Sequence, residues 1–219
     1  QYTYKLNKTN TINIGAVYTL GRTLHGDAYK YHQTGAESNG SIYVQSQTGD
    51  TIPNPFKMPH TFGIGLTYVY DNRLTIGVDY TLQKWNTADL AWSKFNKESV
   101  EMNSRTKIAF GAEFVPSYIS HNYLKRIRYR MGAYYSSPYN KVSYTSPDTG
   151  TTSFQDGARE YGVSIGFGLP MFQSKSMLNI SGQYIKVSPK FKGLMEENYL
   201  RINIGLTFNE RWFMKWKVH

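Results

Sequence analysis

Residues 58–82 read MPHTFGIGLTYVYDNRLTIGVDYTL, two alternating runs joined by a turn at 71–73. Every second residue of each run is large and apolar, namely Phe62, Ile64, Leu66, Tyr68 and Tyr70, then Leu74, Ile76, Val78, Tyr80 and Leu82. A β-strand sends alternate side chains to opposite faces, so the pattern predicts a hairpin with one apolar face. Gly, Thr and Asp occupy the other face, as in a strand pair of an outer-membrane barrel wall.

The same alternation recurs along the rest of the chain. It predicts further strands at residues 12–20, 107–114, 126–135, 161–169, 178–184 and 200–208. With the hairpin they make about eight strands of roughly 9–14 residues, the length that crosses a bilayer when tilted. We therefore expect an all-β fold, a transmembrane antiparallel up-and-down β-barrel. Residues 1–219 form one domain, either a complete barrel or the C-terminal part of a larger one.

The segments between these strands alternate in length. They are residues 25–59, 71–73, 86–104, 116–123, 138–157, 171–175 and 188–196. Outer-membrane barrels have short periplasmic turns and longer external loops, so the alternation predicts that both termini are periplasmic. A soluble sandwich has no reason to sort connector length by end. The predicted location is the outer membrane of a Gram-negative cell.

Aromatic residues are abundant, with 19 Tyr and 4 Trp. Tyr and Trp favour the boundary between membrane and water, and Trp85, Trp92, Trp212 and Trp216 fall near predicted strand ends. An aromatic girdle is one interpretation. The other is the ordinary preference of aromatic residues for β-strands.

Catalytic and metal-binding patterns are weak. The chain has no Cys, which removes disulfides and thiolate metal sites. The histidines, His25, His32, His60, His121 and His219, fall in loops or at strand ends without the spacing of a zinc site. No spacing singles out a Ser-His-acid triad either. We therefore expect no enzyme activity, no metal and no cofactor.

The net charge is +10, and much of the basic charge falls on positions that the alternation makes internal. Arg126, Arg128 and Arg130 are predicted to form a column on one strand, with Lys107 and Arg201 on others. The acidic residues Asp79, Glu113 and Glu160 occupy the same polar face and are candidates to pair with the column. Two interpretations remain: a solvated lumen held by ion pairs, or a cationic ladder that guides an anionic substrate. No nucleic-acid recognition motif accompanies the charge.

Several segments resemble the FadL/TodX family of long-chain fatty-acid transporters. The hairpin at 59–85 resembles one in the C-terminal half of that family, and residues 108–114 with 129–138 are similar to its next strand pair. Residues 161–168 resemble the strand that follows. The family has a fourteen-stranded barrel, an N-terminal plug and an Asn-Pro-Ala motif, and the plug and motif are missing from this sequence. The resemblance implies either the C-terminal part of such a protein or a small barrel of related strand sequence.

The resemblance implies passive transport of hydrophobic compounds such as long-chain fatty acids. The expected partners are then outer-membrane lipid and a hydrophobic small-molecule ligand. A second hypothesis is a non-transporting barrel subunit that binds other outer-membrane proteins in a secretion or assembly complex. A third is a soluble, lipocalin-type carrier whose apolar faces point inward. The chain begins without a signal peptide, so we expect a mature form or a piece of something longer.

Overall fold

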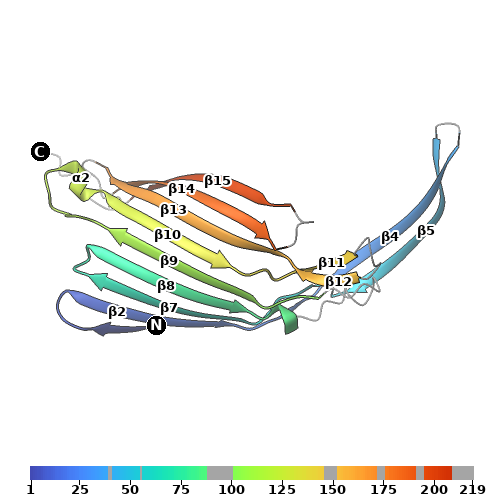
Figure 1. Cartoon of the computed structure of the whole chain (residues 1–219), viewed down its shortest axis with the longest axis horizontal. Helices are drawn as coiled ribbons and strands as arrows, with labels where there is room; N and C mark the ends of the chain where they lie inside the picture. The colour runs from blue at the N-terminus through green and yellow to red at the C-terminus, as the bar shows by residue number, and fades with distance from the viewer. Residues whose placement is uncertain are drawn as a thin grey trace, which may run out of the picture.

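The computed structural model describes residues 1–38, 41–54, 56–87, 101–145, 152–171, 176–190 and 195–208. Its main element is one antiparallel sheet of nine strands in the order β1-β2-β7-β8-β9-β10-β13-β14-β15 (Figure 1). The strands are β1 (Tyr2–Lys5), β2 (Asn10–Thr19), β7 (Thr61–Tyr70), β8 (Leu74–Gln83), β9 (Arg105–Phe114), β10 (Arg128–Ser136), β13 (Ala158–Pro170), β14 (Met177–Pro189) and β15 (Glu197–Thr207). The predicted all-β, antiparallel fold is confirmed.

Strand β1 was not predicted, because its four residues are too short to show an alternation. It pairs with β2 through a turn at residues 6–9. The Asn7 side-chain oxygen organises this turn by accepting hydrogen bonds from the backbone N–H groups of Thr9 at 3.0 Å and Asn10 at 2.8 Å. As a result Tyr2 lies beside Ile14, about halfway along β2, and not at the end where β2 starts.

The turn between β7 and β8 has the geometry that its sequence favours. Asp71 and Asn72 have φ angles of 49° and 51°, and the Arg73 N–H donates to the Tyr70 carbonyl at 2.8 Å. Positive φ at both central residues is what a type I′ hairpin turn requires, and Asp and Asn tolerate it better than most residues. The turn thereby fixes the register of the hairpin that defines the fold.

The three longest connections all lie at one end of the sheet. Residues 6–9, 71–73, 115–127 and 171–176 cross at one end, which we call the short-turn end. Residues 20–60, 84–104, 137–157 and 190–196 cross at the opposite end, the long-connector end. The short-turn end also holds the one-turn helix α2 (Tyr123–Arg126). No helix in the described ranges is long and apolar enough to span a membrane.

Two segments predicted as plain connectors contain hairpins. Residues 25–59 hold β4 (Asp27–Ser38) and β5 (Ser41–Pro53), and residues 138–157 hold β11 (Lys141–Thr145) and β12 (Thr152–Asp156). The short ribbon β3 (Thr23–Leu24) and β6 (Phe56–Lys57) connects the first hairpin to the sheet. Polar residues occupy both faces of β4 and β5, so the sequence lacks the apolar alternation that indicates a half-buried strand.

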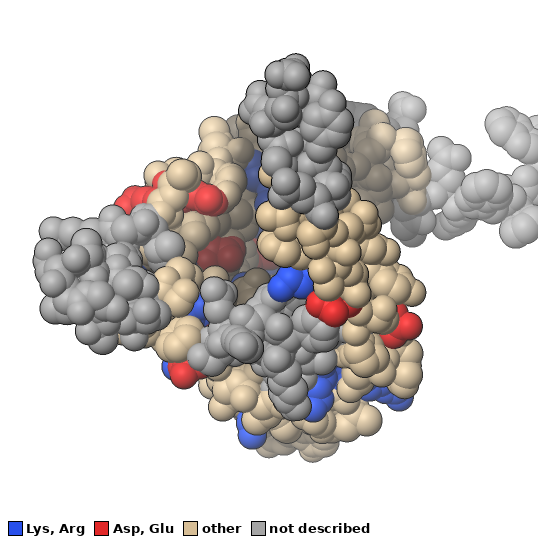
Figure 2. Space-filling view, turned by 90° about the vertical axis from the view of Figure 1, so that its right-hand side faces the viewer, with Lys and Arg blue, Asp and Glu red and all other residues tan. Residues whose placement is uncertain are grey.

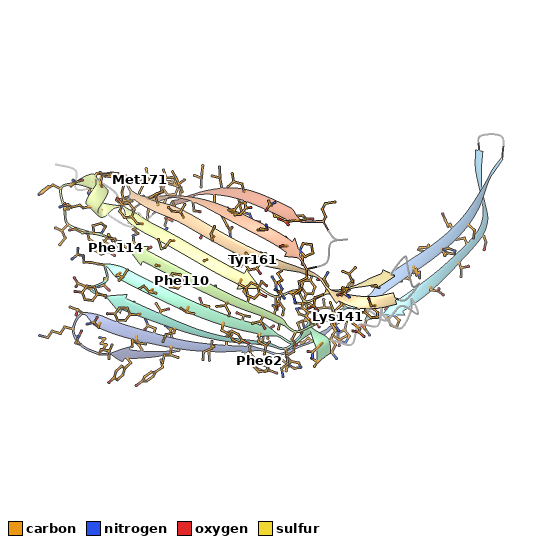
Figure 3. The ribbon with its side chains drawn as sticks, viewed as in Figure 1. Phe62, Phe110, Phe114, Lys141, Tyr161 and Met171 are labelled. Atoms are coloured by element: carbon orange, nitrogen blue, oxygen red, sulfur yellow. The ribbon has the colours of Figure 1, made fainter. Side chains whose placement is uncertain are left out.

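The strand register places all the predicted apolar runs on one face. One row across the sheet reads Ile14, Leu66, Val78, Phe110, Ala133, Val163, Tyr184 and Leu200. This apolar face is exposed, with Ile64 at 55%, Val163 at 55% and Ile204 at 73%. Figure 3 labels Phe62, Phe110, Phe114 and Tyr161, which belong to the same face.

The band of apolar residues does not run straight across the sheet. At the short-turn end the band begins in β2 at Ile12. The row of Ile12 meets β15 at Ile202, but in β15 the band extends four residues further toward the short-turn end, to Leu206. At the other end it reaches Tyr18 in β2 but stops in β15 at Leu200, in the row of Ile14. Both boundaries therefore shift in the same direction from β2 to β15.

The sheet curves around a hollow that carries acidic and basic atoms on its wall (Figure 2). Among the described residues β1 and β15 are its edges, and no ladder joins them. Because seven strands of the antiparallel sheet lie between them, β1 and β15 point in the same direction. The structure therefore shows an open sheet, and the closed barrel expected from the sequence stays a prediction.

A tight contact on the polar face gives a stability test. A Cβ at Gly162 would overlap the ring of Tyr134, which faces it across β10 and β13. We expect Gly162→Ala to lower the free energy of unfolding by about 1–3 kcal/mol, because the ring must move. Gly182→Ala is the control, since nothing lies within 4 Å of a Cβ there. Urea unfolding in detergent measures both, and equal losses would contradict the packing.

Candidate functional site

Seven of the eight predicted charged residues share the polar face of the sheet. The register places Asp79, Lys107, Glu113, Arg128, Arg130, Glu160 and Arg201 opposite the apolar rows. Arg126 does not belong with them. It ends helix α2, two residues before β10 begins, so the predicted three-arginine column contains only Arg128 and Arg130 on the strand. The helix turn interrupts the alternation that the sequence suggested.

Glu113 is the centre of the first charge cluster. Its carboxylate accepts hydrogen bonds from Arg130 Nε at 2.6 Å and from Arg128 at 3.1 Å. Arg130 also donates to the Asn179 side-chain oxygen at 2.7 Å, reaching across β13 to β14. The Arg130 side chain has room to cross β13 because Gly166 lies opposite Arg130 and Gly168 lies opposite Arg128. The glycines leave the space above their strand to the arginine side chains.

The second cluster surrounds Glu160, closer to the long-connector end. The Tyr134 hydroxyl donates to its carboxylate at 2.5 Å, and Arg105 lies 3.8 Å away. Arg105 Nε also donates to the Ser136 hydroxyl at 2.7 Å, and the Lys107 ammonium lies 4.7 Å from the Tyr134 ring centre. Arg105 was missed in the sequence. The signal was there, since it continues the alternation two residues before Lys107.

Two predicted charges form no ion pair in these clusters. Neither Asp79 nor Arg201 forms an ion pair with another residue of the described part of the chain, and Arg201 acts on Tyr134 of the second cluster through its charge alone. Asp79 lies two strands away from the Arg128–Arg130 pair, in the row of Ala109 and Tyr134, so it is out of reach of the arginines. The expected pairing of Asp79 with the column is therefore wrong. That these charges line a barrel lumen stays a prediction.

The described histidines form no metal site. Within the described ranges no three His, Asp or Glu side chains gather closely enough to hold a metal ion. His60 is held by the Tyr18 hydroxyl, 2.7 Å from Nδ1, and by the Gly21 N–H at 3.2 Å. His219 and three residues of the expected aromatic girdle, Trp92, Trp212 and Trp216, lie outside the described residues. Trp85 packs against Tyr139 with ring centres 5.5 Å apart.

The β4–β5 hairpin is the second feature with a candidate role. It projects from the long-connector end, away from the sheet (Figure 1). Tyr29 and Tyr31 are each 64% exposed and, two residues apart on β4, share one face of the hairpin. Exposed Tyr side chains combine a rigid apolar ring with a polar tip, which suits protein–protein contacts.

The Glu113 cluster gives a second prediction. Glu113→Gln leaves Arg128 and Arg130 facing each other without a carboxylate, so we expect the free energy of unfolding to fall by about 1–2 kcal/mol. Asp79→Asn is the matched control and should change stability little, because Asp79 forms no ion pair with another described residue. Urea unfolding of both variants provides the measurement. A larger loss for Asp79→Asn would contradict the assignment of the cluster.

Comparison with known proteins identifies the family. The model of the BamG family matches residues 1–219, the whole of the chain. Neither a search of curated proteins nor one of solved structures gave a match. The family match overturns the resemblance to FadL/TodX transporters, whose supporting motifs consist of alternating residues common to many membrane strands. The chain belongs to the BamG family.

Proposed function

We propose that this chain forms a transmembrane wall in the outer membrane and acts there as a non-catalytic, partner-binding subunit of the β-barrel assembly (BAM) complex. The observation that carries the proposal is the family match over residues 1–219, since the BamG family is associated with that complex. The geometry of the sheet supports the membrane part, and the projecting hairpin supports the partner-binding part.

The exposed apolar face supports a membrane wall. A face this apolar is unusual on a soluble surface, and the opposite face carries the charges, as in a barrel wall between lipid and water. In β7 the band extends from Phe62 to Tyr70. At about 3.4 Å per residue this is roughly 25 Å, the height of the apolar band of outer-membrane barrels.

The diagonal course of the band supports the same assignment. From β2 to β15 its boundaries shift by four residues, about 13 Å, while the seven steps between strands cover about 34 Å. Counting the flanking Leu20 and Phe208 extends the shift to six residues. The strands then tilt by about 20–30° from the normal of the apolar slab, approaching the 35–45° typical of such barrels. A flat membrane crossed by tilted strands produces such a diagonal.

The long connections at one end support an orientation. Outer-membrane barrels keep their short turns in the periplasm, so we propose that the short-turn end is periplasmic and the long-connector end is external. The β4–β5 and β11–β12 hairpins then project outside the cell. The end of β15 lies at the short-turn end, in agreement with a periplasmic position for that part of the chain.

The polar face favours partner binding over transport of hydrophobic compounds. An apolar ligand needs an apolar lining, because each buried methylene contributes about 0.8 kcal/mol. The rows that face the hollow are instead composed mainly of charged, amide, hydroxyl and glycine residues, such as Arg130, Gly166, Ser181 and Asn203. Exposed contact surface is available on the β4–β5 hairpin, where Tyr29 and Tyr31 meet no other strand of the sheet.

The membrane assignment predicts a strong asymmetry between the two faces. Leu66→Arg puts a charge in the middle of the apolar band and should cost about 2–4 kcal/mol of folding stability in a bilayer. Gly15→Ser changes the polar face, where nothing lies within 4 Å of a new Cβ, and should cost much less. Reversible unfolding in lipid vesicles measures both values. Equal penalties would contradict the assignment of faces.

The partner-binding role predicts co-purification with the BAM complex. The tagged full chain, extracted from its own outer membrane, should retain the central BAM barrel subunit, identified by mass spectrometry. Tyr29→Ser with Tyr31→Ser should reduce this retention about tenfold, as expected when aromatic anchors are removed. Ile119→Ser is the control, because Ile119 is 92% exposed at the opposite end. Fatty-acid binding by the full chain without BAM retention would instead refute the proposed role.

A further inference from the structure

The sheet carries a cationic cluster at one boundary of the apolar band. The last apolar row at the long-connector end is Tyr18, Phe62 and Leu82. The ladder continues beyond it, since the Lys84 N–H donates to the His60 carbonyl at 2.9 Å. His60 and Lys84 are therefore the next residues on the same outer face. Positive charge thus starts where the apolar residues stop.

Arg22 extends the cluster by one more row. Arg22 and Met58 exchange backbone hydrogen bonds of 3.2 and 2.7 Å, so they face each other and lie on the same side of the ribbon. Met58 is 50% exposed and lines a depression of about 340 Å³ together with Lys57, Pro59, His60, Phe62, Lys84 and Thr87. Within the described residues, neither Arg22 nor Lys84 forms an ion pair with a carboxylate.

The floor of the depression is fixed. His60 is held by the Tyr18 hydroxyl and the Gly21 N–H, and its ring stacks 5.9 Å from that of Tyr18. Gly21 is needed for this approach, because a Cβ there would lie 2.9 Å from the His60 backbone nitrogen. The Lys84 ammonium lies 5.5 Å from the centre of the Phe62 ring, so its stem covers apolar surface while its charge points outward. Figure 3 marks Phe62 at this end of the sheet.

We infer that Arg22, His60 and Lys84 form a binding site for the phosphate head group of an anionic lipid, whose acyl chains lie along Phe62 and Leu82. The inference rests on the membrane wall proposed above. Cations just beyond an aromatic row occupy the depth of lipid phosphates, and each contributes roughly fivefold to the binding of anionic lipid. Arg and Lys both donate hydrogen bonds to phosphate oxygens, and the adjoining apolar row favours an amphiphile over free phosphate.

Lipid retention tests the site. The full chain is inserted in vesicles of dioleoylphosphatidylcholine containing one-tenth dioleoylphosphatidic acid, extracted in mild detergent, and its bound lipids are quantified by mass spectrometry. We expect the ratio of phosphatidic acid to phosphatidylcholine among the bound lipids to be roughly tenfold higher than in the vesicle. Arg22→Gln with Lys84→Gln should remove the enrichment. Lys186→Gln is the control, because Lys186 lies at the band boundary on β14 but pairs with Glu196 at 2.6 Å.

The outcomes separate the site from the membrane assignment. Retention of the two lipids in the same proportion as in the vesicle, or enrichment that survives in the Arg22/Lys84 variant, would overturn the site alone. Failure to retain either lipid would overturn the membrane wall, and the site with it. Competition with inorganic phosphate shows whether the site recognises a lipid head group or the free anion. If phosphate displaces phosphatidic acid at equal concentration, the site recognises the free anion and the lipid assignment is wrong.

Discussion

The alternation of side chains along hydrogen-bonded strands is the constraint on which the rest of the structure depends. Each ladder fixes which residues lie side by side, and a shift of one residue would move every side chain to the other face. In this chain the ladders from β2 to β15 keep apolar residues with apolar residues through seven successive pairings. The exposed apolar band, its diagonal course and the charged opposite face all follow from that register.

The charged face shows how such a wall accommodates its polar side chains. Glu113 accepts hydrogen bonds from two arginines, and Arg130 extends over the glycines of β13 to donate to Asn179. A Cβ at Gly168 would lie 3.1 Å from Arg128 Cβ and 3.4 Å from its Cδ, so this glycine leaves room for an arginine of the network. Charges that are partly shielded from water are costly without partners, which explains why the clusters combine ion pairs with neutral hydrogen bonds.

The two ends of the sheet have different tasks in the function we propose. The short-turn end is built from tight turns such as the one at Asp71 and Asn72, whose conformations are set locally. The long-connector end carries the projecting hairpins with Tyr29 and Tyr31 and, at the boundary of the apolar band, the cationic cluster around His60. Contacts with partner proteins and with lipid phosphates are thus both expected at this end, one beyond the membrane surface and one at it.

The sequence by itself determined the eight long strands of the sheet, their apolar and polar faces and the polar position of seven charged residues, because the two-residue period of a strand is a local property. It could not distinguish families, since the FadL-like motifs consist of that same period. Only the tertiary structure decided that Arg126 belongs to a helix turn, that Glu113 pairs with Arg128 and Arg130, and that β4 and β5 form a hairpin. It alone brought Arg22, His60 and Lys84 together. These features depend on which distant segments become neighbours, and that is set by ladders between strands and not by the pattern within one strand.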